Sequence, residues 1–182
     1  MELMDAIKNR RSVRKYRTGP VSDEVVQAVL EAARWAPSWA NTQCCRFIVV
    51  RDAELKARLE ATIYGTNPSL PAFTAAPVVV VVCAEREKSG YYHGAPMTNK
   101  GDWYMFDAAL AMQNLCLAAQ ALGLGTVHVA LLDAKKVAGI LKVPPGFAVV
   151  EMTPLGYPDQ EPKPRPRKEL SEIVFHERWG KP

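Results

Sequence analysis

Arginine side chains gather near the start of the chain, in the segment Arg10-Arg-Ser-Val-Arg14. Residues 1–17 hold six basic and two acidic side chains, and this segment alone therefore carries 6 − 2 = +4, the net charge of the whole chain. Guanidinium groups make forked hydrogen bonds to phosphate oxygens, and a serine hydroxyl adds a neutral donor. The segment fits a phosphate site and a solvated basic turn equally well when it is considered alone.

A second basic cluster lies near the other end of the chain, in Lys163-Pro-Arg-Pro-Arg167. Five prolines between residues 154 and 166 predict an extended segment that cannot lie within a central strand. In polyproline geometry the segment would hold its basic side chains on a stiff support at little entropic cost. Taken alone, the cluster is more typical of a tail that charge keeps soluble.

The third chemical feature is an amide-rich loop that contains Pro37, Ser38, Asn41 and Gln43. Amide side chains both donate and accept hydrogen bonds, so they suit heteroaromatic rings and polyhydroxyl chains. A self-capped turn is the more common explanation of such a loop by itself. Basic clusters at both ends of the chain, with this loop between them, favour a site for a bound anion.

Several other kinds of site are excluded by motif. Gly123-Leu-Gly125 would need a third glycine where His128 stands, and it follows a helix instead of a strand, so it is no dinucleotide fingerprint. No Walker loop and no G-x-S-x-G motif occur. The four cysteines and three histidines show neither metal-ligand nor disulfide spacing. By itself, His128 is better explained as a packed strand residue than as a catalyst.

The elements that must position these residues follow from periodicity. Ser22 precedes an apolar helical stripe as an N-cap, and residues 78–83 are apolar on both faces, as in a central strand. Residues 102–122 form the longest predicted helix, apolar around most of its circumference, which indicates that a second subunit covers one side. The remaining expectations are helices at 2–9, 52–62 and 133–142, an irregular or short helical stretch at 64–73, a lid loop at 85–101, and strands at 47–50, 126–132 and 148–152.

Length and composition limit the number of domains and the class of protein. The chain has 182 residues, of which 48% are hydrophobic and 23% charged, so we expect one soluble domain over residues 1–182 with an extended arm from about residue 156. The longest apolar run, residues 75–84, is too short to span a bilayer, and the N-terminus has no signal-peptide pattern, which predicts a cytoplasmic protein without a membrane partner. Because the basic charge is local, nucleic acid is not an expected partner.

Together these segments resemble the nitroreductase family of flavoproteins. The resemblance covers nearly the whole chain, and its motifs occur in the family's order: Arg10-Arg-Ser-Val-Arg14 followed by Tyr16, Pro37-Ser-x-x-Asn41-x-Gln43 followed by Arg46-Phe-Ile-Val-Val50, the helix that ends at Gly123-Leu-Gly125, and Leu155-Gly-Tyr-Pro158 with the basic run after it. The chain departs from the family at Cys44-Cys45, where Pro-Trp is frequent.

The resemblance implies an α+β fold with a mixed, mostly antiparallel sheet flanked by helices, in an obligate homodimer with a long central interface helix. It implies one FMN in each of two pockets between the subunits, with NADPH or NADH as electron donor. Arg14 would lie near the N1–C2 carbonyl edge of the flavin, and Asn67 or Ser69 are candidates for its pyrimidine edge. The other residues carried over are Arg10, Arg11, Ser12, Arg165 and Arg167 on the phosphate side, Pro37, Ser38, Asn41 and Gln43 from the partner, and His128, Val129, Ala130 and Leu131 beside the ring.

The implied activity is electron transfer from NAD(P)H to nitroaromatics, quinones or similar acceptors by a ping-pong mechanism. No metal and no obligatory catalytic side chain are expected, because solvent can supply the protons, and Arg14 would stabilise the reduced flavin. The alternatives are a flavin carrier or sensor without turnover, a flavin enzyme of the same fold with dehalogenating or flavin-fragmenting chemistry, and a module that binds phosphate or nucleic acid through its basic arms.

Overall fold

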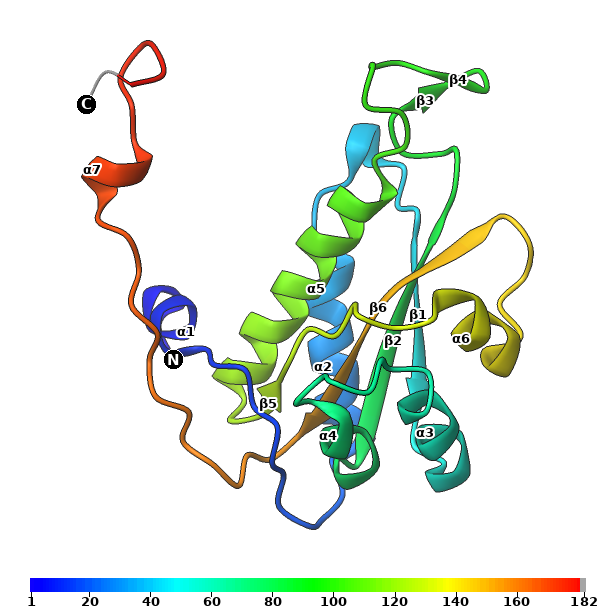
Figure 1. The fold of residues 1–182 in the computed structure, drawn as a ribbon, viewed down its shortest axis with the longest axis vertical. Helices are drawn as coiled ribbons and strands as arrows, with labels where there is room; N and C mark the ends of the chain where they lie inside the picture. Colours follow the sequence, from blue (N-terminus) through cyan, green and yellow to red (C-terminus); the bar gives the residue numbers. More distant parts are fainter. Residues whose placement is uncertain (181–182) are drawn as a thin grey trace.

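The valine run at residues 78–82 forms the first five residues of a central strand, β2 (Val78–Glu85), and all five valines are fully buried. The computed structural model describes residues 1–180, and the final two residues of the predicted arm lie outside the described residues. Its main sheet is antiparallel, with strand order β1-β2-β6-β5 (Figure 1). The other strands are β1 (Cys45–Val50), β3 (Tyr91–Tyr92), β4 (Ala95–Pro96), β5 (Gly125–Thr126) and β6 (Phe147–Gly156).

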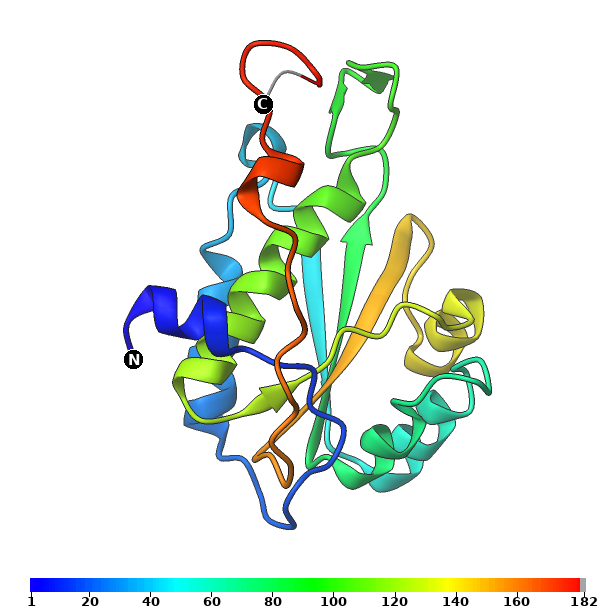
Figure 2. The same cartoon turned by 60° about the vertical axis from the view of Figure 1, so that its left-hand side comes forward.

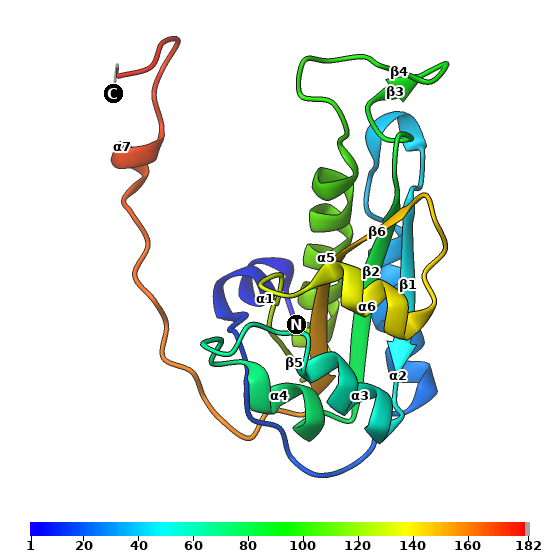
Figure 3. The same cartoon turned by 45° about the vertical axis from the view of Figure 1, so that its right-hand side comes forward.

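Helices cover both faces of this sheet (Figures 1 and 3). Successive β2 side chains point to opposite faces. Val78, Val80 and Val82 therefore pack against α2 and α5, whereas Val79 and Val81 pack with α3, α4 and α6. The helices are α1 (Leu3–Asn9), α2 (Asp23–Arg34), the 3-10 turn η1 (Trp39–Asn41), α3 (Ala53–Glu60), α4 (Leu70–Ala75), α5 (Tyr104–Ala121), α6 (Ala134–Leu141) and α7 (Leu170–Ile173).

Local chemistry sets the ends of the principal helices. The Ser22 side chain accepts a hydrogen bond from the Val25 amide and caps α2, as predicted. At the other end of the core, Gly123 adopts a φ of +77°, and the Leu124 amide donates to the Ala119 carbonyl at 2.8 Å. This arrangement ends α5 in the usual way for a glycine after a helix and turns the chain into β5.

Two predictions about the strands next to α5 are wrong. The strand expected at 126–132 ends at Thr126, because the Val127 amide donates to the Thr153 hydroxyl instead of to a ladder carbonyl, and only an isolated bridge joins Val129 to Met152. Pro154, expected outside any central strand, lies within β6. Pro154 lies between the residues of β6 that pair with β5 and Met152, which bridges Val129. The ladder on that edge of β6 is interrupted there, so the amide hydrogen that proline lacks is not needed.

Two segments extend beyond the packed layers. The polar stretch predicted as a lid contains the short β3–β4 hairpin, which lies beyond the N-terminal end of α5 (Figure 1). After β6 the chain runs as an extended arm that carries α7 and stands away from the body in Figures 1 and 3, whereas in Figure 2 it passes in front of the body. Leu170 and Trp179 on this arm are 72% and 90% exposed. Among residues 1–180, no helix has the length and apolar character needed to cross a bilayer.

Candidate functional site

The basic segment after α1 is fixed against strand β5. Ser12 forms a parallel bridge with Thr126, and the Val13 amide donates to the Thr126 carbonyl at 2.9 Å. Gly125 permits this close approach, because a Cβ atom there would come within 2.7 Å of the Val13 side chain. Backbone contacts to the sheet therefore hold the arginines on either side of Ser12 in place.

A cavity of about 920 Å³ lies between this segment and the C-terminal arm. Basic side chains dominate its wall, which contains no acidic residue, and the fold thus joins the two basic clusters from opposite ends of the sequence. The cavity is lined by all six residues that are predicted to contact the phosphate or the N1–C2 edge of the flavin. The lining residues are Ile7, Lys8, Arg10, Arg11, Ser12, Arg14, Pro162, Lys163, Pro164, Arg165, Pro166 and Arg167.

The Arg10 guanidinium indicates what this cavity suits. Its Nη1 atom is buried and has no hydrogen-bond acceptor within residues 1–180. A buried charged donor without an acceptor costs roughly 1–3 kcal/mol or more. Arg11, in contrast, donates to the carbonyls of Lys8 at 2.6 Å and Arg10 at 3.0 Å. An anion with several oxygens would satisfy Arg10, and the cavity volume leaves room for an organic group attached to that anion.

Arg14 is oriented by a buried serine. Its Nε donates to the Ser69 hydroxyl at 2.9 Å, and Ser69 is only 2% exposed. The Ser69 amide in turn donates to the Asn67 side chain at 2.9 Å. Of the two candidates from the 64–73 region, Ser69 is thus the one in contact with Arg14, and Asn67 shapes the turn that presents it.

The segment after β5 presents unpaired backbone amides next to this cluster. Val129 is buried and bridged to Met152, whereas Ala130 and Leu131 are exposed. Neither the Ala130 nor the Leu131 amide donates a hydrogen bond to any acceptor in residues 1–180. Two consecutive free N–H groups on an exposed segment can donate to a ligand that lies along it.

His128 on the same segment is hydrogen-bonded at both ring nitrogens. Its Nδ1 lies 2.9 Å from a carboxylate oxygen of Glu151, and its Nε2 lies 3.4 Å from the Cys116 sulfur. These hydrogen bonds, to Cys116 and to Glu151, raise the pKa of His128 to about 10. Sequence reasoning placed His128 beside the ring but missed both partners, which come from α5 and β6.

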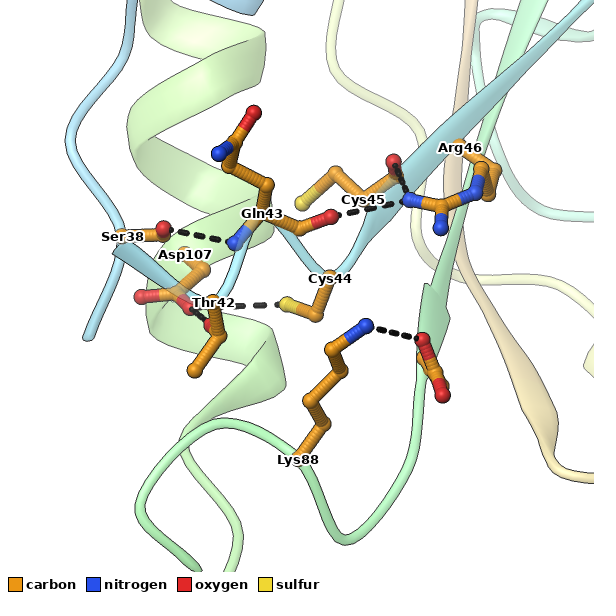
Figure 4. A network of polar contacts seen from close by, with 9 residues as sticks. Ser38, Thr42, Gln43, Cys44, Cys45, Arg46, Lys88 and Asp107 are labelled. Atoms are coloured by element: carbon orange, nitrogen blue, oxygen red, sulfur yellow. Dashed lines mark hydrogen bonds and ion pairs between the residues drawn. The ribbon is translucent and has the colours of Figure 1, made fainter. Parts of the chain in front are cut away.

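The amide-rich loop is held by one buried carboxylate, Asp107 of α5 (Figure 4). Asp107 is 1% exposed and accepts hydrogen bonds from the Trp39 amide at 3.1 Å, the Cys44 thiol at 3.4 Å and the Thr42 hydroxyl at 3.5 Å. Within the loop, the Gln43 amide donates to the Ser38 hydroxyl at 2.9 Å. Sequence reasoning missed Asp107, although a single acid in the apolar part of a long helix was a usable signal.

Left-handed backbone gives this loop its shape. Ala40, Asn41 and Gln43 have φ values of +44°, +56° and +50°. Non-glycine residues rarely adopt this conformation, and a cluster of three requires the surrounding contacts to hold it. The Asp107 hydrogen bonds supply those contacts, so the loop is built to present its side chains in one arrangement.

The loop and the basic cavity do not meet within this chain. The loop attaches to the first turn of α5, whereas the basic segment pairs with β5, which follows the other end of that helix. An 18-residue helix is about 27 Å long. Pro37, Ser38 and Gln43 line a different cavity, of about 680 Å³, together with Cys44 and Cys45.

The Cys44-Cys45 pair lies behind the loop. The hydrogen bond to Cys45, burial and the Asp107 carboxylate together raise the pKa of the Cys44 thiol, which therefore stays protonated and acts as a donor. The same hydrogen bond from Cys44 lowers the pKa of the Cys45 thiol. Both cysteines are free, and the pair occupies the position of the Pro-Trp that is frequent in the family the sequence resembles.

Comparison with known proteins agrees with the motifs. The protein-family sequence model described as Nitroreductase family matches residues 7–72 and 65–157 of this chain. A protein of Archaeoglobus fulgidus named for NADH dehydrogenase and NAD(P)H nitroreductase activities is 36% identical over 165 residues, which cover 88% of this chain and 87% of the relative. The structure of an FMN-dependent nitroreductase from Clostridium difficile R20291 superposes with a TM-score of 0.81 at 27% identity, covering 95% of this chain and 98% of that one.

Relatives of similar extent have names for other chemistry. A 5,6-dimethylbenzimidazole synthase of Rhodospirillum rubrum is 30% identical over 95% of this chain and 88% of its own length. An iodotyrosine deiodinase of Thermotoga neapolitana is 28% identical over 92% of this chain and 95% of its own length. Similarity at this level therefore fixes the family but leaves the reaction open.

Proposed function

The chain belongs to the nitroreductase family, and we propose that it is an FMN-dependent oxidoreductase that transfers electrons from NAD(P)H to nitroaromatics, quinones or similar acceptors. The observation that carries the proposal is the unpaired, buried Arg10 donor in a cavity walled by basic side chains from both ends of the chain. A phosphate monoester that carries a large ring system fits that donor set and that volume.

The residues divide by role along the cavity. Arg10, Arg11, Ser12, Arg165 and Arg167 would hold the FMN phosphate, because each of them lines the basic cavity. When bound, FMN supplies the two-electron chemistry by accepting a hydride from NAD(P)H and passing the electrons to the acceptor.

The ring would lie along the segment after β5. Arg14, fixed by Ser69, would place its positive charge where negative charge gathers on the reduced ring. The free amides of Ala130 and Leu131 would donate to the ring edge. No side chain of this protein needs to donate a proton, since the electron acceptor can take its protons from water.

We further propose that a second copy of the chain completes each site. The copy would contribute Pro37, Ser38, Asn41 and Gln43, which lie at the opposite end of α5 from the basic cavity of their own protomer. Apolar surface supports this assembly: Leu3 and Met4 on α1 are 65% and 55% exposed, and Met105 and Phe106 on α5 are 59% and 55% exposed. A homodimer would bury this surface and the apolar side chains of the arm.

An anaerobic absorption spectrum tests the proposal directly. The purified protein should be yellow, should lose its flavin absorption on addition of NADPH or NADH, and should regain it with a quinone or nitroarene. Colourless protein that takes up no FMN would refute the cofactor. Protein that binds FMN but is not reduced by either nucleotide would instead be a carrier or sensor.

The division of roles has its own test in two variants. Arg14→Ala should lower the reduction potential of bound FMN more than it weakens FMN binding. Arg167→Ala should weaken binding more than it lowers the potential, by about tenfold if one charged hydrogen bond of about 1.5 kcal/mol is lost. Lys168→Ala, which removes a cation of the same arm outside the cavity wall, is the matched control. Equal effects of Arg14→Ala and Arg167→Ala on both properties would contradict the assignment.

A second reaction class is favoured by the relatives named as a deiodinase and a dimethylbenzimidazole synthase. Both reactions would use FMN at the same site: a dehalogenation would change only the substrate, whereas a flavin-fragmenting reaction would consume the FMN itself. Assay of the reduced protein with 3-iodotyrosine, and of the FMN-loaded protein for aerobic loss of flavin, decides between these reactions and the reduction of nitroarenes and quinones.

A further inference from the structure

A thiol, an imidazole and a carboxylate from three different elements meet beside the proposed cofactor segment. Cys116 comes from α5, His128 follows β5, and Glu151 comes from β6. His128 contacts both Glu151 oxygens, at 2.9 and 3.1 Å, and the Cys116 sulfur at 3.4 Å. Nothing in the proposed function uses this cluster.

Burial sets the charge that the cluster holds. The Glu151 side chain is 10% exposed, and His128 is its sole ion-pair partner within residues 1–180. A buried carboxylate without a compensating charge is costly, so the fold favours a proton on His128. With both of its ring nitrogens occupied by Glu151 and Cys116, the imidazole is fixed in orientation.

The surrounding titratable groups are consistent with a positive His128. Tyr16 lies near Cys116, and burial raises the pKa of its hydroxyl, which donates to the Val13 carbonyl at 2.8 Å and stays neutral. Arg14 is close enough to Tyr16 to oppose part of that rise in pKa. Cys116 is completely buried. The acid that faces His128 is therefore Glu151, which lies deeper in the fold than the imidazole.

His128 lies near the proposed ring by its place in the chain. Ser12 forms an isolated parallel bridge with Thr126, where β5 ends, and Arg14 and His128 each follow that bridge by two residues. The free amides of Ala130 and Leu131 follow directly on the His128 segment. The His128 side chain is 37% exposed, so one edge of the imidazole remains open on the surface of this segment.

We propose that His128, held between Glu151 and Cys116, is a second fixed positive charge that stabilises reduced FMN alongside Arg14. The inference rests on FMN being the cofactor. Reduction by a hydride adds negative charge to the flavin ring, and a nearby cation whose position is already fixed favours that reduced form over the neutral oxidised form. Because Glu151 keeps the proton on the imidazole, His128 acts through its charge and not as a proton donor.

The charge on His128 can be measured without the cofactor. In the FMN-free protein, nitrogen NMR should show both ring nitrogens of His128 protonated and no titration between pH 6 and 8. Cys116→Ala removes one partner and should lower the pH at which His128 titrates. Cys83→Ala, which removes a buried thiol in the core on the other face of the sheet, is the matched control and should leave His128 unchanged. A wild-type His128 that titrates near pH 6.5 overturns the proposal.

The effect on the cofactor is measured as a reduction potential. His128→Gln keeps a hydrogen-bonding side chain and removes the charge, and it should weaken binding of reduced relative to oxidised FMN about tenfold. A tenfold change corresponds to a potential about 30 mV lower for a two-electron couple. His176→Gln, in the exposed arm, should leave the potential unchanged. A His128→Gln protein that is folded, binds FMN and keeps the wild-type potential overturns the proposal.

Two further results keep this inference separate from the proposed function. Glu151→Gln should also lower the potential, because it removes the negative charge that stabilises the protonated imidazole. This variant replaces His128→Gln as the test if His128→Gln fails to fold. A protein that binds FMN but does not oxidise NAD(P)H would end the oxidoreductase assignment, yet its potential and the NMR titration would still decide the role of His128.

Discussion

Replacement of Asp107 by alanine tests whether one buried carboxylate holds the amide-rich loop. The change removes the acceptor for the Trp39 amide at 3.1 Å, the Cys44 thiol at 3.4 Å and the Thr42 hydroxyl at 3.5 Å. Asp107 is 1% exposed, so water cannot easily replace it. The loop contains three residues in left-handed backbone, which depends on these contacts.

The magnitude follows from the three contacts. The Trp39 amide has the shortest hydrogen bond, and a hydrogen bond to a charged acceptor contributes roughly 1.5–3 kcal/mol. The thiol is a weak donor and the hydroxyl is at the distance limit, so together they add about 1 kcal/mol. Asp107→Ala should therefore lower the free energy of unfolding by about 2.5–4 kcal/mol. Asp107→Asn, which keeps an acceptor for Trp39, should cost about half as much.

The assay combines urea unfolding of the FMN-free protein with FMN binding followed by flavin fluorescence. Asp107→Ala should weaken FMN binding as well as stability, because the loop is proposed to complete the site of the partner subunit. Asp133→Ala is the matched control: Asp133 caps α6 by accepting the Lys136 amide at 3.1 Å, and its loss should cost about 1 kcal/mol without changing FMN affinity.

Two outcomes would refute the reasoning about Asp107. The first is a change in unfolding free energy below about 0.5 kcal/mol, which is the range of ordinary surface substitutions. The second is an equal loss of FMN affinity in Asp107→Ala and Asp133→Ala, which would mean that affinity follows overall stability and not the position of the loop.

Two further predictions concern packing and pH. Gly125→Ala should destabilise the protein by about 1–3 kcal/mol in urea unfolding, because the new Cβ meets Val13 at 2.7 Å. Gly139→Ala lies in a helix, where a new Cβ has no neighbour within 4 Å, and it should stabilise the protein by about 0.5–1 kcal/mol. Changes of the same sign in both variants would contradict the packing argument. The pKa of His128 is raised in the folded state to about 10, from about 6.5 when unfolded, so its contribution to stability is complete below about pH 6.5 and is lost as the pH rises to 10. Urea unfolding of the FMN-free protein should therefore show a decline in stability from pH 7 to 10 that is smaller in His128→Gln, and equal declines would exclude the histidine as its source.

Much of the fold was predictable because its signals are local. The valine run at 78–82 is apolar on both faces, which only a central strand between two layers can bury. Ser22 caps its helix by a contact three residues away, and Gly123 ends α5 through its own backbone conformation. Such signals depend on residues that are neighbours in the chain, so the sequence contains them completely.

The predictions for the strands were wrong where a residue distant in the sequence changes the backbone hydrogen bonding that the local sequence favours. The segment after Thr126 has the composition of a strand, but the Thr153 hydroxyl takes the Val127 amide and interrupts the ladder. That interruption is also where Pro154 can lie within β6. No pattern around either residue could reveal this, because the partner lies more than twenty positions away.

By itself, the sequence determined which chemical groups are present: arginines at both ends for an anion, an amide-rich loop, and a helix too apolar to stand alone. Only the tertiary structure decided what those groups meet. It joined Arg10 to Arg167 around one cavity, fixed Arg14 on Ser69, anchored the loop on Asp107, and set His128 between Glu151 and Cys116. The physical reason is that a buried polar group without a partner is costly, and which partner is within reach depends on how distant segments pack.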